Sequence, residues 1–148
     1  MIYIGADHRG FELKEYLRKW LTDEGYRVVD VGNHEFDPED DAVDFAIKAA
    51  EMVEGGERGD LGILLCGSGH EMEMTANKFP GIRAILGFNL EVTQMGREHD
   101  GANILSLPAE WVSEEEAKER VRVFLESEEK THEKYERRRA KLGSLRVA

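Results

Sequence analysis

Short runs of apolar residues alternate along the chain with stretches in which apolar positions recur at helical spacing. The apolar runs predict five strands, at residues 2–6, 26–31, 61–66, 82–86 and 103–107. The helical stretches predict six helices, at about 11–24, 42–53, 70–77, 90–98, 113–125 and 128–141. Ser113, with Glu116 three residues on, is a capping box that starts the fifth of them. The run at 61–66 is almost unbroken, which is typical of a central parallel strand buried on both faces. We therefore expect an α/β fold, a Rossmann-like five-stranded parallel sheet with helices on both faces.

The polar C-terminal segment differs from the rest of the chain. We expect residues 1–148 to form a single domain, since this length suits one hydrophobic core. Residues 126–148, however, carry few large apolar side chains, so the domain's own core is not expected to hold this helix and tail. Docking at a subunit interface is one explanation and a frayed tail is the other; the fold prediction places the helix at an interface.

Charge and composition exclude several classes of function. The formal net charge is −11 and the pI is near 4.9. Such a surface repels polyanions, so we do not expect nucleic-acid binding. No apolar stretch approaches the roughly 18 residues of a membrane span, and the first residues lack the pattern of a secretory signal. We expect a cytoplasmic protein, and the single cysteine, Cys66, excludes an internal disulfide.

The residues that follow each predicted strand are the candidates for chemistry, because ligands of open α/β sheets bind beyond the carboxyl ends of the strands. Cys66 ends the third strand and begins the turn CGSG, whose glycines allow close backbone approach to an oxyanion. A helix start also lowers the pKa of a thiol, so Cys66 is a candidate proton shuttle or nucleophile. The alternative is a small buried hydrophobe. Asp7 and His8 follow the first strand, either as a polar pair in the same crevice or as a turn and helix cap.

Other polar clusters indicate less. His70, Glu71 and Glu73 do not share one helix face, so we predict no metal site, and no cofactor is expected. The arginines at 137–139 are either a solvated face or an anion clamp. His99 precedes the fifth strand, at the opposite end of the sheet from Cys66, and could join this site only through a neighbouring subunit or an unusual loop.

Five segments together resemble one family. GADHRGFELK, DVG, GILLCGSG, ANKFPGIRAIL and REHDGANIL, in this order, are similar to the ribose-5-phosphate isomerase B / galactose-6-phosphate isomerase family over nearly the whole chain. The resemblance implies a Rossmann-like enzyme that interconverts aldose and ketose sugar phosphates through an enediolate, without metal. It also implies a homodimer or homotetramer whose active sites are shared between two subunits, which would explain the position of His99.

The resemblance assigns roles residue by residue. Cys66 matches the base that moves a proton between C1 and C2, Ser68 a hydroxyl that assists it, and His99 the residue that opens the sugar ring. The other matched positions contact the substrate, its enediolate or its phosphate: Asp7, His8, Gly67, Gly69, Asp100, Lys134 and Arg138.

The departures from the family pattern lie at the site. Glu71 replaces a glycine of the anion hole, Asp100 replaces an amide, and Glu110 replaces an arginine, whereas Arg9 is a gained cation. Carboxylates close to a phosphate oppose its binding. The sequence therefore leaves two hypotheses open: an aldose–ketose isomerase of a sugar phosphate or a related sugar, and a non-catalytic sugar-binding or structural homologue.

Overall fold

The computed structural model describes residues 1–145 and contains a five-stranded parallel sheet in the order β2-β1-β3-β5-β4. The strands are β1 (Ile2–Ala6), β2 (Val28–Gly32), β3 (Leu61–Cys66), β4 (Ala84–Leu86) and β5 (Ile104–Pro108). The helices are α1 (Phe11–Asp23), α2 (Ala42–Gly55), α3 (His70–Ala76), α4 (Leu90–Asp100), α5 (Glu114–Glu126) and α6 (Glu133–Gly143). A short 3-10 turn, Ala109–Trp111, follows β5. The predicted fold class is thus confirmed.

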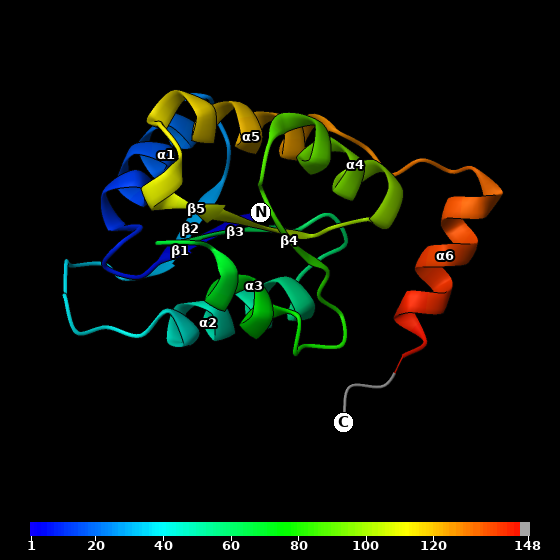
Figure 1. Ribbon diagram of the computed structural model, residues 1–148, viewed down its shortest axis with the longest axis horizontal. Coiled ribbons are helices and arrows are strands. Elements are labelled where there is room, and N and C mark those ends of the chain that lie inside the picture. The colour runs from blue at the N-terminus through cyan, green and yellow to red at the C-terminus, as the bar shows by residue number, and fades with distance from the viewer. Residues whose placement is uncertain (146–148) are drawn as a thin grey trace.

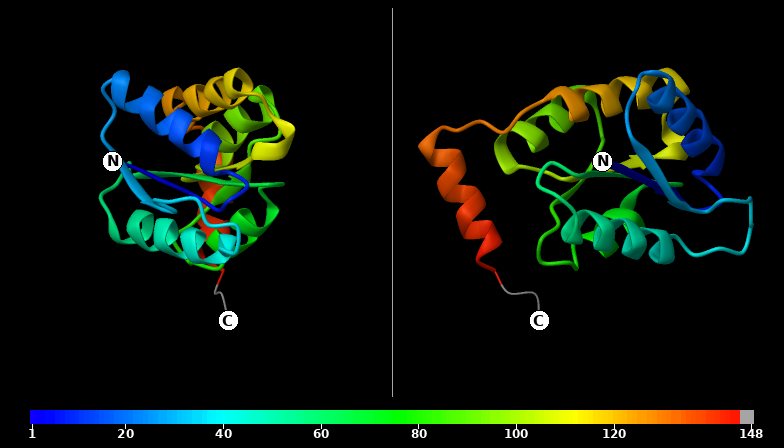
Figure 2. Two further views of the ribbon diagram at one scale, coloured as in Figure 1. Left: turned by 90° about the vertical axis from the view of Figure 1, so that its left-hand side faces the viewer. Right: turned by 180° about the vertical axis from the view of Figure 1, so that it is seen from behind.

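Helices cover both faces of the sheet in three layers. α1, α4 and α5 lie on one face, and α2 and α3 lie on the other (Figures 1 and 2). On the first face, Leu17, Leu21 and Phe124 are fully buried against the strands. On the second face, the alanines of α2 bring that helix close to the sheet, with Phe45 and Met72 filling the space between. The central strand β3 is buried along its whole length, as its apolar run predicted.

The starts of two predicted strands differ from the structure because local hydrogen bonds hold the chain out of the strand. β2 begins at Val28, since the Tyr26 N–H still donates to the Leu21 carbonyl of α1. β4 begins at Ala84, since the Ile82 N–H closes a turn onto Phe79. The capping box at Ser113 is present as predicted and starts α5.

The C-terminal helix α6 stands apart from the layers. It begins at Glu133 and not near 128, because the Lys130 N–H donates to the Glu98 carbonyl at 2.8 Å and holds the preceding segment extended. None of its residues is buried, and it lies beside the end of α4, outside the sandwich (Figure 1). The low apolar content predicted this detachment; the end of the predicted tail, residues 146–148, lies outside the described range. Within residues 1–145, no helix is both long and apolar enough to cross a membrane.

Candidate active site

Cys66 lies at the carboxyl end of the central strand, where β3 turns into α3. Its side chain is buried, and its Sγ accepts the N–H of Gly69 at 3.1 Å. Gly69 adopts a left-handed conformation (φ +80°), and an added Cβ would lie 2.6 Å from Leu86. The turn therefore requires glycine at this position. Ser106, on β5, donates to the Gly69 carbonyl at 2.6 Å and supports the turn, a contact that no local pattern predicts.

The pKa of the Cys66 thiol is raised, contrary to the lowered value expected from its position before a helix. Burial is the largest cause, and the carboxylates of Asp7 and Glu71 add to it. The N–H groups of Met72 and Gly69 act in the opposite direction but do not outweigh burial. The sequence-based expectation counted the helix terminus and missed the loss of water around the sulfur.

Asp7, His8 and Asp40 form a polar cluster beside this turn, with side-chain atoms that lie within 4.8 Å of one another. Asp7 accepts the N–H groups of Arg9 and Gly10 at 3.0 and 3.1 Å, so it holds the predicted turn before α1, but the predicted helix cap is absent, since α1 has no side-chain cap hydrogen bond. It also lines the pocket with Cys66, so the interpretation as a polar pair in the same crevice holds as well. Burial raises the pKa of Asp7.

His8 is held by a residue that the sequence reasoning missed. Asp40 accepts the His8 backbone N–H at 2.9 Å and lies 2.7 Å from the ring Nδ1. This hydrogen bond raises the pKa of His8. Burial alone would raise the pKa of Asp40, but the hydrogen bonds from Asn33 and His8 outweigh it and lower that pKa. The sequence around Asp40, residues 33–41, is rich in acidic side chains, but this composition does not indicate which of them contacts His8.

A pocket of about 250 Å³ joins these two groups at the carboxyl end of the sheet. Its lining comes from three loops and consists of Asp7, His8, Arg9, Asp40, Asp41, Ala42, Cys66, Gly67, Ser68 and Glu71. Five of the ten predicted site residues therefore line one cavity. Glu71 faces it, whereas Glu73 points away and accepts the Leu86 N–H at 3.1 Å.

Arg9 and Glu110 meet at the edge of this pocket. The Arg9 Nε lies 3.4 Å from a Glu110 carboxylate oxygen, and both side chains are about half exposed. An added Cβ on Gly67 would lie 2.8 Å from the Arg9 side chain and 3.3 Å from the Glu110 carboxyl carbon. The two departures from the family pattern are therefore in contact with each other, directly above the glycine turn.

Of the other five predicted site residues, Gly69 lies in the turn beside Cys66, and four lie at the opposite end of the sheet. His99 and Asp100 are on the last turn of α4, and Lys134 and Arg138 are on α6. The His99 ring stacks on Tyr135 with centroids 4.4 Å apart. Within one chain these four residues do not reach Cys66, as the sequence predicted for His99.

A metal-binding geometry is present at one place among residues 1–145. The ligand atoms of Asp7, His8 and Asp40 lie within 4.8 Å of one another. The hydrogen bonds between His8 and Asp40, and those of Asp7 to the turn before α1, already account for their arrangement, so we derive no step through a metal. The acidic cluster at the start of α3, which the sequence raised and set aside, does not converge in this way.

Comparison with known proteins agrees with this architecture. Residues 2–142 match the family model described as Ribose/Galactose Isomerase. The probable ribose-5-phosphate isomerase B of Mycoplasma genitalium is 38% identical over 126 residues, covering 85% of this chain and 83% of the relative. Ribose-5-phosphate isomerase B of Escherichia coli is 37% identical over 84% of this chain and 82% of its own length.

Solved structures of similar proteins superpose closely. The ribose-5-phosphate isomerase B of Mycoplasma genitalium with bound ribulose-5-phosphate has a TM-score of 0.91 and 36% identity, covering 95% of this chain and 92% of that one. The ribose 5-phosphate isomerase of Thermotoga maritima also has a TM-score of 0.91, at 35% identity and 97% coverage of both chains. The extent of these matches shows that the chain belongs to the Ribose/Galactose Isomerase family.

Proposed function

We propose that this protein interconverts ribose 5-phosphate and ribulose 5-phosphate by proton transfer at Cys66. The observation that carries the proposal is the joint placement of the Cys66 thiol, the glycine turn and the Asp7–His8 pair in one pocket. The chain is an aldose–ketose isomerase by family, and a close structural relative binds ribulose-5-phosphate.

The proposed chemistry uses the turn between β3 and α3. A thiolate at Cys66 takes the proton from C2 of the open-chain aldose, the electron pair forms the C1–C2 double bond, and O1 becomes an oxyanion. After a proton moves from O2 to O1, the thiol returns its proton to C1. In this proposal the Gly67 N–H faces the developing oxyanion, the Gly69 N–H donates to the Cys66 sulfur, and Ser68 supplies a hydroxyl beside the base.

A second copy of the chain completes the site in this proposal. His99 and Arg138 lie far from Cys66 in their own chain, so each would serve the pocket of a partner, His99 in opening the sugar ring and Arg138 in holding phosphate. Lys134 and Asp100 would accompany them. Large apolar side chains near α4, among them Phe88 at 67% exposure and Met95 at 46%, offer a surface for such a homodimer. Pairing of dimers into a tetramer and a cytoplasmic location stay predictions.

The carboxylates of the pocket repel an anionic substrate, so a cation must offset this repulsion if a sugar phosphate is to bind. Among the described residues that line it, Arg9 is the one side chain that is always cationic, against four carboxylates. A carboxylate about 4 Å from a phosphate costs on the order of 1 to 4 kcal/mol, depending on exposure. In our proposal Arg9 offsets this repulsion from above Gly67, and Glu110 orients its guanidinium. The same carboxylates favour the second candidate function, a sugar-binding homologue without turnover.

Turnover of ribose 5-phosphate and of ribose, compared in the parent and in Cys66→Ala, separates the two functions. We expect turnover of the phosphate ester that falls by roughly 100- to 10,000-fold in Cys66→Ala, the usual contribution of a general base. Circular dichroism checks that the variant is folded. A folded parent that turns over neither sugar would exclude this isomerase and favour the binding function.

Mixing two inactive variants tests the shared site. If Cys66→Ala and His99→Ala are each inactive, a mixed dimer would carry one intact site, so mixing after unfolding and refolding should restore roughly a quarter of parental activity. His34→Ala, an exposed histidine elsewhere on the chain, is the control and should stay active. Failure of the mixture to recover would mean that the two residues serve the same chain, whereas an active His99→Ala variant would mean that His99 has no role.

A further inference from the structure

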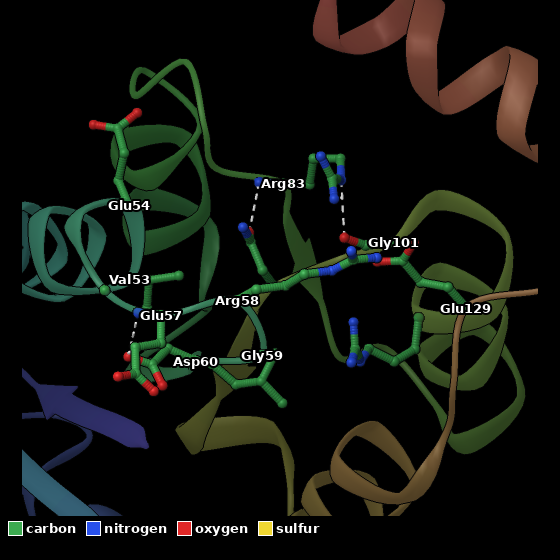
Figure 3. Close-up of a pocket in the computed structure, with 13 residues that line it drawn as sticks. Val53, Glu54, Glu57, Arg58, Gly59, Asp60, Arg83, Gly101 and Glu129 are labelled. Carbon is green, nitrogen blue, oxygen red and sulfur yellow. Dashed lines mark hydrogen bonds between the residues drawn. The ribbon is translucent and has the colours of Figure 1, made fainter.

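A second cavity opens at the amino ends of the strands, at the opposite edge of the sheet from Cys66. Its volume is about 460 Å³, and it lies between the end of α2, the start of β3 and the last turn of α4 (Figure 3). Arg58, Arg83 and Arg97 reach it from three different segments of the chain. None of the roles assigned above uses these arginines.

The three arginines lack carboxylate partners. Within residues 1–145, none of them lies within 4.0 Å of a carboxylate oxygen, although the chain has 31 acidic residues against 20 lysines and arginines. Three guanidinium groups, none of them in an ion pair with a carboxylate of the described residues, thus surround one cavity whose lining also holds four carboxylates.

Most acidic residues of the lining are engaged elsewhere. Asp60 binds the amino group of Met1 at 2.8 Å. Glu54 accepts the Gly81 N–H at 2.7 Å. Glu129 pairs with Arg139, which is not part of the lining, at 3.4 Å. Glu57 is the remaining carboxylate of the lining.

The guanidinium groups keep donors to spare. Arg83 donates from Nε to the Gly101 carbonyl, and Arg97 donates from one terminal nitrogen to Ala102, both at about 2.9 Å. Each guanidinium has five N–H groups, so most are left over. The Arg97 Nε is buried and has no hydrogen-bond partner among the described residues, which is costly for a polar group.

The electrostatics of Arg97 agree with a charge that Glu129 compensates only in part. Burial lowers its pKa, and the neighbouring Arg83 lowers it further, whereas Glu129 acts in the opposite direction. An anion bound in the cavity would reverse both unfavourable effects.

We propose that this cavity is a second ligand site, one that binds the phosphate group of a small metabolite. Arginine pairs with phosphate through two parallel hydrogen bonds, and three guanidinium groups match its several oxygens. The volume falls in the range of small-molecule sites, so it accommodates a phosphate ester with a modest organic part. Glu57, at the same cavity, can accept a hydrogen bond from a hydroxyl of that part. This site does not depend on the proposed isomerase activity.

Titration calorimetry with inorganic phosphate, at constant ionic strength, tests the proposal. Arg58→Gln is the main variant, since no hydrogen bond or ion pair of its side chain holds the fold together within the described residues. Loss of one charge-assisted pair should weaken phosphate binding roughly 10-fold. Arg27→Gln removes the same charge from an exposed arginine outside the cavity and should leave the affinity within about two-fold of the parent.

The experiment must distinguish phosphate bound in the Arg58 cavity from phosphate bound at the candidate active site. Arg138→Gln, whose proposed role is at that site, should leave the phosphate site of the Arg58 cavity unchanged. Absence of phosphate binding, equal weakening by Arg27→Gln and Arg58→Gln, or weakening by Arg138→Gln alone would each overturn the proposal.

Discussion

Gly10→Ala should damage both stability and activity, because the start of α1 lies directly against the strand that carries Cys66. A Cβ built on Gly10 lies 2.6 Å from the carbonyl oxygen of Leu65 and 2.7 Å from its carbonyl carbon, whereas ordinary contacts begin at 3.4 Å. The difference between 3.4 and 2.6 Å requires α1 and β3 to separate by about 0.8 Å. Both clashing atoms belong to the backbone of a central strand, so no side-chain rotation relieves them.

The cost follows from this geometry. Overpacking of a core costs about 1–3 kcal/mol, and a rigid backbone neighbour places Gly10→Ala at the upper end of that range. Since Leu65 precedes Cys66, the shift also moves the thiol, and misplacement of about 1 Å lowers catalysis on the order of 100-fold. Urea unfolding and the kcat for ribose 5-phosphate measure the two effects.

Gly55→Ala is the matched control for this experiment. Gly55 is the last residue of α2, and an added Cβ there meets nothing within 4 Å. This variant should be as stable as the parent or more stable by up to about 1 kcal/mol, with unchanged kcat. If Gly10→Ala unfolded at the same urea concentration as Gly55→Ala and kept its activity, the close packing of α1 on β3 would be wrong.

Two further substitutions test buried polar contacts. Lys14 is fully buried and donates to Asp30 at 2.7 Å, so Lys14→Met should lower the free energy of unfolding by about 3–5 kcal/mol. The control, Lys19→Met, changes an exposed lysine and should cost less than about 1 kcal/mol. Equal effects of the two variants in urea unfolding would contradict the buried ion pair. Asp40→Asn should lower the pKa of His8, because the hydrogen bond to Asp40 raises it. The stabilisation from protonated His8 is present below the ordinary histidine pKa and is lost as the pH rises through the raised pKa. NMR titration of the His8 ring should therefore show its transition at a lower pH in Asp40→Asn than in the parent. An unchanged titration would exclude Asp40 as the cause of the raised pKa.

Much of the fold was predictable because its signals are local. The apolar run of β3 and the capping box of α5 depend on residues a few positions apart, and both are present where the pattern placed them. The position of the pocket was predictable from these elements, since the carboxyl ends of parallel strands lie at one edge of the sheet. Cys66 ends the central strand, so its place in the pocket was predictable from the same pattern.

The parts that were missed depend on contacts across the chain. Asp40 closes on His8 from a loop 32 residues away, and Lys14 occupies a buried position on a helix whose apolar spacing does not include it. The raised pKa of Cys66 has the same origin. The residues of the turn do not indicate how much water the neighbouring helices exclude from the sulfur. A prediction from the turn alone therefore gave a lowered pKa for Cys66, which is wrong.

Alkylation of Cys66 follows that pKa directly, since the thiolate is the reactive form. In the chain described here, burial and the carboxylates of Asp7 and Glu71 raise the pKa, so the iodoacetamide rate should keep rising at pH values where an ordinary thiol has levelled off. Glu71→Gln removes one of these carboxylates and should shift the pH–rate profile to lower pH, whereas Glu73→Gln, on the same helix but turned away from the pocket, should not. A profile that matches an ordinary or activated thiol in the parent would refute the effect of burial. If Glu71→Gln and Glu73→Gln gave equal shifts, the effect would be a general one of net charge, and the position of Glu71 in the pocket would not be its cause.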